Sequence, residues 1–226
     1  MVLSLSSINA AILSRRLQRL RRDLPSGTQL LAVSKGHSAA AVAALAEVGQ
    51  KDFGESRVQE ALSKQELLKM FPELRWHFIG RLQSNKVRHV VRRFDIVHSL
   101  DKLDLCQRVS RIALEERRRP EVLFQVKFRD DPSKGGWEPN SLRHAWPDIL
   151  KLPGLHPVGL MTICPQNLDE SEQRQIFRSC RGLADELLLP DCSMGMSSDW
   201  QLAVNEGATW VRLGSFLFSS RSTGPV

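Results

Sequence analysis

Short apolar runs alternate with longer amphipathic stretches along the chain, and this alternation constrains the fold more than any other feature. The apolar runs predict strands at residues 29–33, 52–54, 76–79, 96–100, 122–128, 156–163, 192–195 and 209–214. The stretches between them predict helices at residues 38–48, 57–70, 85–93, 102–118, 140–151, 169–189 and 199–206. Because the strands are continuously apolar rather than alternating, we expect both faces of a parallel sheet to be covered.

Eight such strand–helix units can close into a (β/α)8 barrel. An open doubly wound sheet is the alternative, but six strands are more usual there, and no GxGxxG motif follows the first strand.

The eighth helix is supplied by the N-terminal stretch, where four leucines recur at helical spacing: Leu13, Leu17, Leu20 and Leu24. That stretch is also rich in Ser and Arg and poor in acids, as transit peptides are. Because only "PSG" separates it from the first strand, we favour a structural helix. The sequence thus predicts an α/β protein whose single domain spans residues 1–226.

Composition narrows the possible partners and location. The formal net charge of +7 invites a nucleic-acid interpretation, but the arginines are spread over several predicted helices without interleaved aromatic residues. Solvated helix faces explain them better, and we expect no nucleic-acid partner. No apolar stretch approaches the roughly 20 residues of a spanning helix, so we expect no membrane segment. The four cysteines show neither CxxC pairing nor metal spacing, which predicts free thiols, no metal and a cytoplasmic location.

Lys35 follows the first predicted strand directly, in "LLAVSKGH". In a barrel of this type the chemistry lies at the carboxyl ends of the strands. The side chain could simply extend into solvent, or its amine could point into the mouth of the barrel and condense with a carbonyl group. Position alone leaves both interpretations open.

The last two strands are followed by loops suited to an anion. "SMGMSSDW" places a glycine and two serines before a predicted helix, where backbone N–H groups favour negative charge. A plain helix cap, with Ser198 and Gln201 forming a capping box, is the alternative. "RLGS" after the eighth strand adds a second turn beside it, and barrels frequently hold phosphate between these two loops. An amine on strand one and a phosphate cup on strands seven and eight together suit an aldehyde that carries a phosphate, and pyridoxal 5′-phosphate is such a molecule.

Seven motifs in order resemble those of the pyridoxal-phosphate-binding homeostasis proteins (the YggS/PROSC family). They are "AVSKGH", "FGESRVQEA", "WHFIGRLQSNK", "VHSLDK", "VGLMTI", "GMSSDWQLAV" and "VRLGSFLF". The resemblance implies a modified (β/α)8 TIM barrel like the N-terminal domain of alanine racemase, with the cofactor held on Lys35 as an aldimine. The implied cofactor-binding set is Lys35, Ser56, His77, Met196, Ser197, Arg212, Gly214 and Ser215. Ser56 stands where the family usually has asparagine, so its contact with the cofactor's phenolic oxygen would be longer.

Two features argue against strong catalysis. Arg212 resembles the arginine that faces the pyridine nitrogen in racemase-type barrels, and a donor-only guanidinium keeps that nitrogen unprotonated and a poor electron sink. The racemases also use a tyrosine as second acid/base, and this sequence contains no tyrosine. Cys164 or His77 could substitute, although each is more commonly a packed core residue.

These observations predict a protein that binds pyridoxal phosphate and acts in its intracellular homeostasis. They assign no residue a catalytic role. The expected partners are the cofactor and apo forms of pyridoxal-phosphate enzymes, and the chain is expected to be a monomer. Lys134, in the loop after the fifth strand, is more commonly a solvated loop lysine, and a second amine that assists cofactor exchange is the alternative. A vestigial amino-acid racemase or decarboxylase is the alternative, and a basic nucleic-acid-associated factor is a third.

Overall fold

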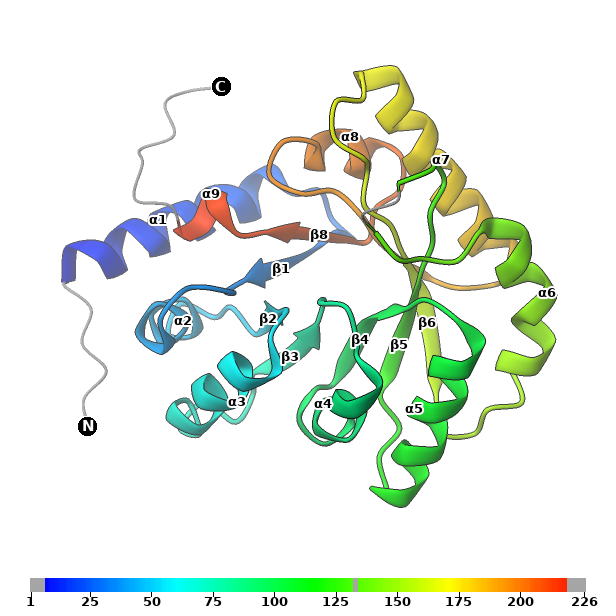
Figure 1. The fold of residues 1–226 in the computed structure, drawn as a ribbon. Coiled ribbons are helices and arrows are strands. Elements are labelled where there is room, and N and C mark those ends of the chain that lie inside the picture. Colours follow the sequence, from blue (N-terminus) through cyan, green and yellow to red (C-terminus); the bar gives the residue numbers. More distant parts are fainter. Residues whose placement is uncertain (1–6, 132–133, 219–226) are drawn as a thin grey trace.

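Eight parallel strands close into a barrel, each pairing with the next in sequence and the last pairing with the first. The structure, a computed structural model, describes residues 7–131 and 134–218 (Figure 1). The strands are β1 (Gln29–Val33), β2 (Asp52–Glu55), β3 (Arg75–Phe78), β4 (Ile96–Leu100), β5 (Glu121–Gln125), β6 (His156–Met161), β7 (Asp191–Ser193) and β8 (Trp210–Leu213). The predicted (β/α)8 barrel is therefore confirmed, and every predicted strand is present.

Helices surround the barrel and separate consecutive strands (Figure 1). They are α1 (Ser7–Asp23), α2 (Ala39–Ala46), α3 (Val58–Leu67), α4 (Val87–Arg93), α5 (Leu103–Glu115), α6 (Pro139–Ile149), α7 (Glu170–Glu186), α8 (Trp200–Asn205) and α9 (Ser215–Phe218), with a 3₁₀ turn η1 (Ser84–Lys86) before α4. The 3₁₀ turn and the four-residue α9 are the features that periodicity did not predict, because one turn of helix is too short to show a period.

The N-terminal stretch is a packed helix, as predicted. Leu17 and Leu20 of α1 are fully buried, and the guanidinium of Arg16 donates to the carbonyl of Leu217 at 3.0 Å. The helix therefore joins the last turn of the described chain to the barrel, and its leucines contribute to the main core.

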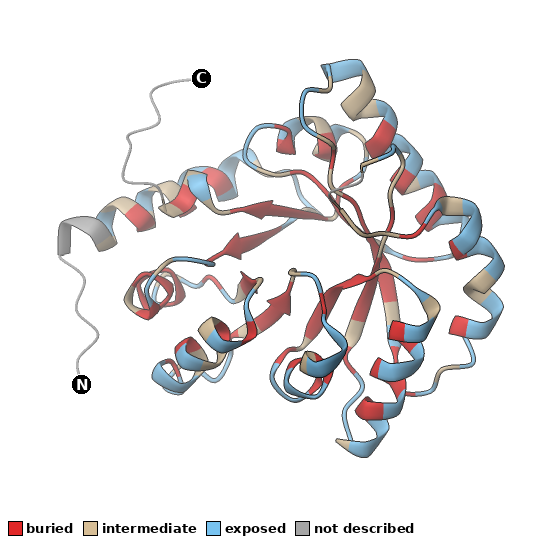
Figure 2. Cartoon of the chain, viewed as in Figure 1, coloured by how far each residue is buried: buried red, intermediate tan, exposed pale blue. Residues whose placement is uncertain are grey.

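Strand side chains alternate between two environments. Outward-facing residues such as Ala32, Phe53 and Val97 belong to the main apolar core. This core is buried between the strands of the barrel and the surrounding helices (Figure 2). The barrel interior holds a much smaller apolar cluster, formed by Ile96, Leu123, Val158 and Met161. The interior also contains buried polar side chains, which sets it apart from the usual layers of branched apolar residues. Four of them concern the site: His77, His98, Ser193 and Arg212.

Three further observations concern the described residues alone. In the described ranges, the groups of His, Cys, Asp and Glu include none that could hold a metal ion. No helix among the described residues has the length and apolar character needed to cross a bilayer. All four cysteines are buried and free.

Candidate functional site

Lys35 lies in a turn directly after β1, at the carboxyl end of the barrel, and its side chain is exposed. Among the residues that the structure describes, none makes a hydrogen bond or an ion pair with its ammonium group. Its two neighbours, in contrast, are held firmly. The structure therefore fixes the backbone of this turn and leaves the amine available.

A buried lysine fixes that backbone from α3. Lys64 Nζ donates to the carbonyl oxygen of Ser34 at 2.7 Å and to Glu55 Oε1 at 2.6 Å. The same carboxylate oxygen accepts from the Ser34 hydroxyl at 2.7 Å. Lys64 also pairs with Glu60 Oε1 at 2.7 Å, and that oxygen accepts from the backbone N–H of Gly36 at 2.5 Å. One ammonium and two carboxylates thus hold both residues that flank Lys35.

The two carboxylates of this cluster differ in their electrostatics. Glu55 is fully buried, its Oε2 has no hydrogen-bond partner in the described structure, and burial raises the pKa of its carboxyl despite the hydrogen bonds from Lys64 and Ser34. For Glu60, burial alone would raise the pKa, but hydrogen bonds from Lys64 and from the Gly36 N–H outweigh it and lower the pKa. Removal of Lys64 would therefore leave Glu55 as an uncompensated buried acid.

The two predicted phosphate loops meet at the same end of the barrel. The hydroxyl oxygens of Ser197, in the loop after β7, and Ser215, at the start of α9, lie 2.6 Å apart. Gly214 packs so closely on β1 that an added Cβ would lie 3.0 Å from the carbonyl oxygen of Val33. Because Val33 is two residues before Lys35, the turn of Ser215 and the turn of Lys35 follow neighbouring strands, β8 and β1.

The backbone at Met196 differs from the expectation. Its N–H already donates to Asp199 Oδ1 at 2.6 Å, so it is not a free donor in this structure. The alternative, a capping box of Ser198 and Gln201, is not formed: Asp199 is the N-cap residue of α8 and makes no side-chain bond to the helix. Since α8 has only six residues, its N-terminus alone does not make an anion site, and the two serine hydroxyls are the side-chain donors that the loops bring together.

Arg212 lies inside the barrel beneath these loops and is almost fully buried. Its Nη1 donates to the carbonyl oxygen of Ser193 at 2.6 Å and to the hydroxyl of Ser193 at 3.0 Å, and its Nη2 donates to the carbonyl oxygen of Thr162 at 2.9 Å. Burial lowers the pKa of the guanidinium to about 10, which still leaves it charged at neutral pH. A guanidinium has five N–H donors, and these three bonds leave its Nε–H and one Nη2–H without a partner among the described residues.

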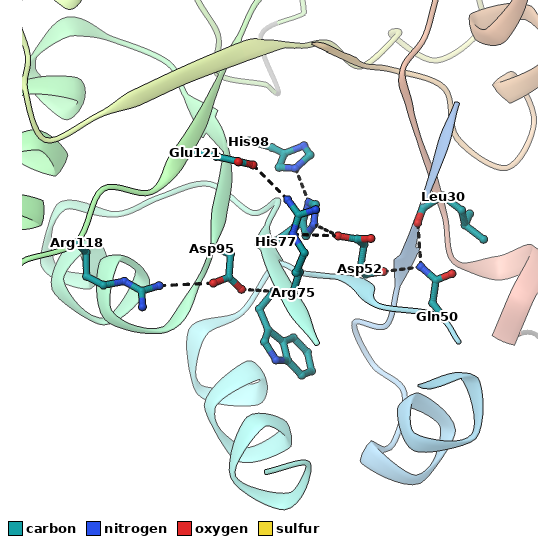
Figure 3. Close-up of polar contacts among 10 residues, drawn as sticks. Leu30, Gln50, Asp52, Arg75, His77, Asp95, His98, Arg118 and Glu121 are labelled. Carbon is teal, nitrogen blue, oxygen red and sulfur yellow. Dashed lines mark hydrogen bonds and ion pairs between the residues drawn. The ribbon is translucent and has the colours of Figure 1, made fainter. Parts of the chain in front are cut away.

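His77 is not brought to the mouth of the barrel. Its ring is fully buried, with Nε2 3.0 Å from Asp52 Oδ1 and Nδ1 2.9 Å from Nε2 of His98 (Figure 3). Asp52 is the first residue of β2, so His77 faces the amino end of the barrel rather than the loops that carry chemistry. Its predicted place beside the cofactor therefore has no support in the geometry. His98, which the motif "VHSLDK" contains but which we did not single out, lies between His77 and Ser193.

Three further predicted residues lie at the mouth. Ser56 follows β2 and borders a pocket of about 540 Å³ with Arg81 and Lys86. Lys134 Nζ donates to the carbonyl oxygen of Cys164 at 3.1 Å and pairs with Asp131 at 3.0 Å, which places it beside the end of β6. Burial raises the pKa of the Cys164 thiol to about 12, so it is protonated at neutral pH and a poor acid/base.

Comparison with known proteins identifies the family to which the chain belongs. The family model of the alanine racemase N-terminal domain matches residues 8–222. Pyridoxal phosphate homeostasis proteins of Synechocystis and Pseudomonas aeruginosa are each 41% identical to this chain, over 204 and 217 residues, which cover 88% and 95% of it and 94% of either relative.

Among solved structures, PipY of Synechococcus elongatus with pyridoxal phosphate bound superposes with a TM-score of 0.88 at 46% identity, covering 92% of this chain and all of PipY. Alanine racemase of Clostridium difficile, at 16% identity and a TM-score of 0.78 over 94% of this chain and 58% of the racemase, shares the fold alone. The chain therefore belongs to the pyridoxal phosphate homeostasis proteins, which are built on the alanine racemase N-terminal domain.

Proposed function

We propose that this protein binds pyridoxal 5′-phosphate and takes part in its homeostasis without strong catalysis of its own. The observation that carries the proposal is the packing of Gly214 on β1, which sets the Ser197–Ser215 hydroxyl pair beside the turn of Lys35. An available amine and a pair of hydroxyls at the same end of the barrel suit the aldehyde and phosphate groups of one small ligand. The relatives named above carry the same function in their names, and PipY holds the cofactor.

Each residue has a distinct task in this proposal. When bound, the cofactor supplies an aldehyde that forms a covalent carbon–nitrogen link with an amine. Lys35 supplies that amine, Ser197 and Ser215 donate to the phosphate, and the free Nε–H of Arg212 faces the ring nitrogen. Ser56 donates from the end of β2. Gly214 allows the phosphate loop to approach β1, while Met196 contributes only if its N–H leaves Asp199.

The acid/base groups favour storage and exchange over turnover. A positioned acid or base contributes about 10²–10⁴-fold to a rate. The sequence has no tyrosine, the Cys164 thiol has its pKa raised to about 12, and His77 is paired with Asp52 at the far end of the barrel. A vestigial racemase or decarboxylase is the second candidate, and amino-acid turnover at ordinary enzyme rates would establish it.

We also propose that the cofactor passes to apo enzymes and that Lys134 assists this exchange from the mouth of the barrel. Lys134→Ala should slow the transfer of cofactor to an apo enzyme without changing the visible spectrum, and an equal transfer rate would remove Lys134 from the mechanism. The contact of Lys134 with the Cys164 carbonyl supports its place there.

A monomer in the cytoplasm, with no nucleic-acid or membrane partner, fits the same picture. The closed sheet leaves no strand edge open for pairing, and buried free thiols suit a reducing compartment. Much of the positive charge is paired with acids on the surface, as in the contacts of Arg143 with Glu186 and of Arg178 with Glu206.

Replacing the hydroxyl pair tests the proposal. Ser197→Ala with Ser215→Ala should weaken retention of pyridoxal phosphate by about tenfold or more, since a hydrogen bond to a charged group contributes about 1.5–3 kcal/mol. Ser63→Ala, which removes an exposed hydroxyl on α3, is the matched control. Equal dissociation constants for the double variant and the control, measured by absorbance titration, would place the phosphate elsewhere.

A further inference from the structure

A continuous line of hydrogen bonds crosses the barrel interior and is not explained by cofactor binding alone. It starts at Arg212, beneath the mouth, and passes through Ser193 on β7 and His98 on β4. It continues through His77 on β3 and ends at Asp52 on β2, at the amino end (Figure 3). The four successive contacts, from Arg212 Nη1 to Asp52 Oδ1, measure 3.0, 3.0, 2.9 and 3.0 Å.

The two ends determine the direction of every hydrogen bond between them. An ionised carboxylate can only accept, so His77 donates its Nε2–H to Asp52. In a neutral imidazole the other nitrogen is then an acceptor, so His98 donates its Nε2–H to His77 Nδ1. His98 Nδ1 must therefore accept from the Ser193 hydroxyl. At the other end, the guanidinium of Arg212 can only donate, and the Ser193 oxygen accepts from it.

The surroundings of the two rings support this neutral arrangement. Both histidines and Ser193 are fully buried, and burial is the main cause that lowers the pKa of each histidine. The His77 ring also packs against Trp210 in a T-shaped arrangement, with ring centroids 5.0 Å apart. Neither ring can turn over without breaking two hydrogen bonds in a water-excluded interior, where each unpaired group is costly.

The far end of the line is itself anchored. Asp52 Oδ1 lies 3.6 Å from Nε of Arg75, and Nη2 of Arg75 lies 3.2 Å from Oε2 of Glu121 on β5 (Figure 3). The acceptor that sets the direction of the line is therefore held by a cation on the neighbouring strand, and it cannot easily rotate away from His77.

From this geometry we infer that Ser193, His98 and His77 are positioning residues that hold Arg212 so that its Nε–H stays free for a ligand. The hydroxyl proton of Ser193 is drawn towards His98, so the serine oxygen presents a lone pair to Nη1 and keeps that nitrogen occupied. Together with the carbonyls of Ser193 and Thr162, this fixes three of the five donors of Arg212. The inference rests on the proposed function, in which the Nε–H, one of the two donors left over, meets the cofactor's ring nitrogen.

Long-range proton–nitrogen correlation NMR on the cofactor-free protein tests the direction of the line without any ligand. Both histidines should be neutral at pH 7, with Nε2 protonated and Nδ1 unprotonated. A protonated Nδ1 on either ring, or a charged ring, would overturn the inference. This result is independent of whether the protein binds pyridoxal phosphate.

The second measurement compares Ser193→Ala with Ser110→Ala, both of which remove a buried hydroxyl. Ser110 lies on α5 and accepts from the Gly154 N–H, far from Arg212 in the hydrogen-bond network. With both variants folded, as judged by their melting curves, Ser193→Ala should bind pyridoxal phosphate about tenfold more weakly and shift the absorption maximum of the bound cofactor. Ser110→Ala should do neither.

The outcomes separate the two claims. If Ser193→Ala keeps the affinity and spectrum of the parent protein, the positioning role is wrong while cofactor binding stands. If the parent protein fails to bind pyridoxal phosphate, the proposed function is wrong, and the NMR result still decides the direction of the line.

If Ser193→Ala does not fold, His77→Gln takes its place, because the glutamine amide can both accept a hydrogen bond from His98 and donate one to Asp52. The positioning role is supported if His77→Gln keeps the affinity for pyridoxal phosphate and the absorption maximum of the bound cofactor while His77→Leu binds more weakly and shifts that maximum. It is contradicted if His77→Leu changes neither.

Discussion

At the scale of single residues, the turn of Lys35 shows how a reactive amine can be left available while its backbone is fixed. Lys64 contacts Ser34 directly and Gly36 through Glu60. The cost of this arrangement is a fully buried Glu55 with one unsatisfied oxygen. Such a cluster is stable only while its cation is present, since a lone buried charge is strongly destabilising.

Lys64→Met should therefore lower the free energy of unfolding by about 3–5 kcal/mol, the usual loss when one partner of a buried ion pair is removed. It should also weaken pyridoxal phosphate binding in protein that remains folded, because the turn of Lys35 loses both supports. Lys69→Met is the control, since Lys69 is exposed and its ion pair is with the exposed Glu66. Chemical denaturation and absorbance titration measure the two effects, and equal behaviour of the two variants would contradict this role for Lys64.

At the scale of elements, the loop between β7 and α8 depends on one glycine. Gly195 has a φ of +88°, and an added Cβ would lie 2.6 Å from the Cβ of Ala203 on α8. Both the left-handed backbone and the close approach of α8 require glycine at this position. The loop that carries Ser197 is therefore shaped by the packing of a helix onto it.

Gly195→Ala should destabilise the protein and weaken cofactor retention, because the added methyl group pushes α8 and the Ser197 loop apart. Gly182→Ala is a matched control on α7, where an added Cβ meets nothing within 4 Å. It should raise the free energy of unfolding by about 0.5–1 kcal/mol, since alanine favours the helix over glycine. Melting temperatures that change in the same direction for both variants would show that Gly195 is not required for the loop.

The order of elements could be predicted because continuous apolar strands and amphipathic helices differ in period over several residues. Lys35 and the Ser197 and Ser215 loops could be placed together because a parallel barrel gathers the ends of its strands at one face. The direction of His77 could not be predicted, because it depends on which partner its ring meets inside the barrel. The role of Lys64 could not be predicted either, since a lysine on a helix is ordinarily solvated.

At the scale of the whole molecule, the closed barrel and its polar interior have separate consequences. Because each strand pairs on both sides, no sheet edge is left to recruit a second copy. Light scattering should therefore give the mass of a monomer, both with and without pyridoxal phosphate. A stable dimer with amino-acid turnover at ordinary enzyme rates would favour a true enzyme instead.

The polar interior should make stability depend on pH. Burial holds the pKa of His77 and of His98 below the usual 6.5, so between about pH 7 and pH 5 the unfolded chain takes up protons that the folded chain does not. The free energy of unfolding should fall as pH falls through this range, by up to about 1.4 kcal/mol per pH unit for each histidine. The raised pKa of Glu55 acts in the opposite direction and reduces the net slope.

The comparison with His77→Gln isolates one histidine's share of that slope. Urea denaturation at a series of pH values should show a shallower dependence for the variant than for the parent protein. If the two dependences are the same, His77 is not held neutral by burial in the folded state.

The central claim, that Lys35 is the residue that holds the cofactor, is tested most directly by borohydride reduction followed by peptide mapping. The protein mixed with pyridoxal phosphate should be yellow, and reduction should leave the phosphopyridoxyl group on the peptide that contains Lys35. Lys35→Ala should fold normally, because the side chain is exposed and makes no contact that supports the core, and it should lose both the colour and the label. A label on another lysine of the parent protein, with Lys35 unmodified, would contradict the account.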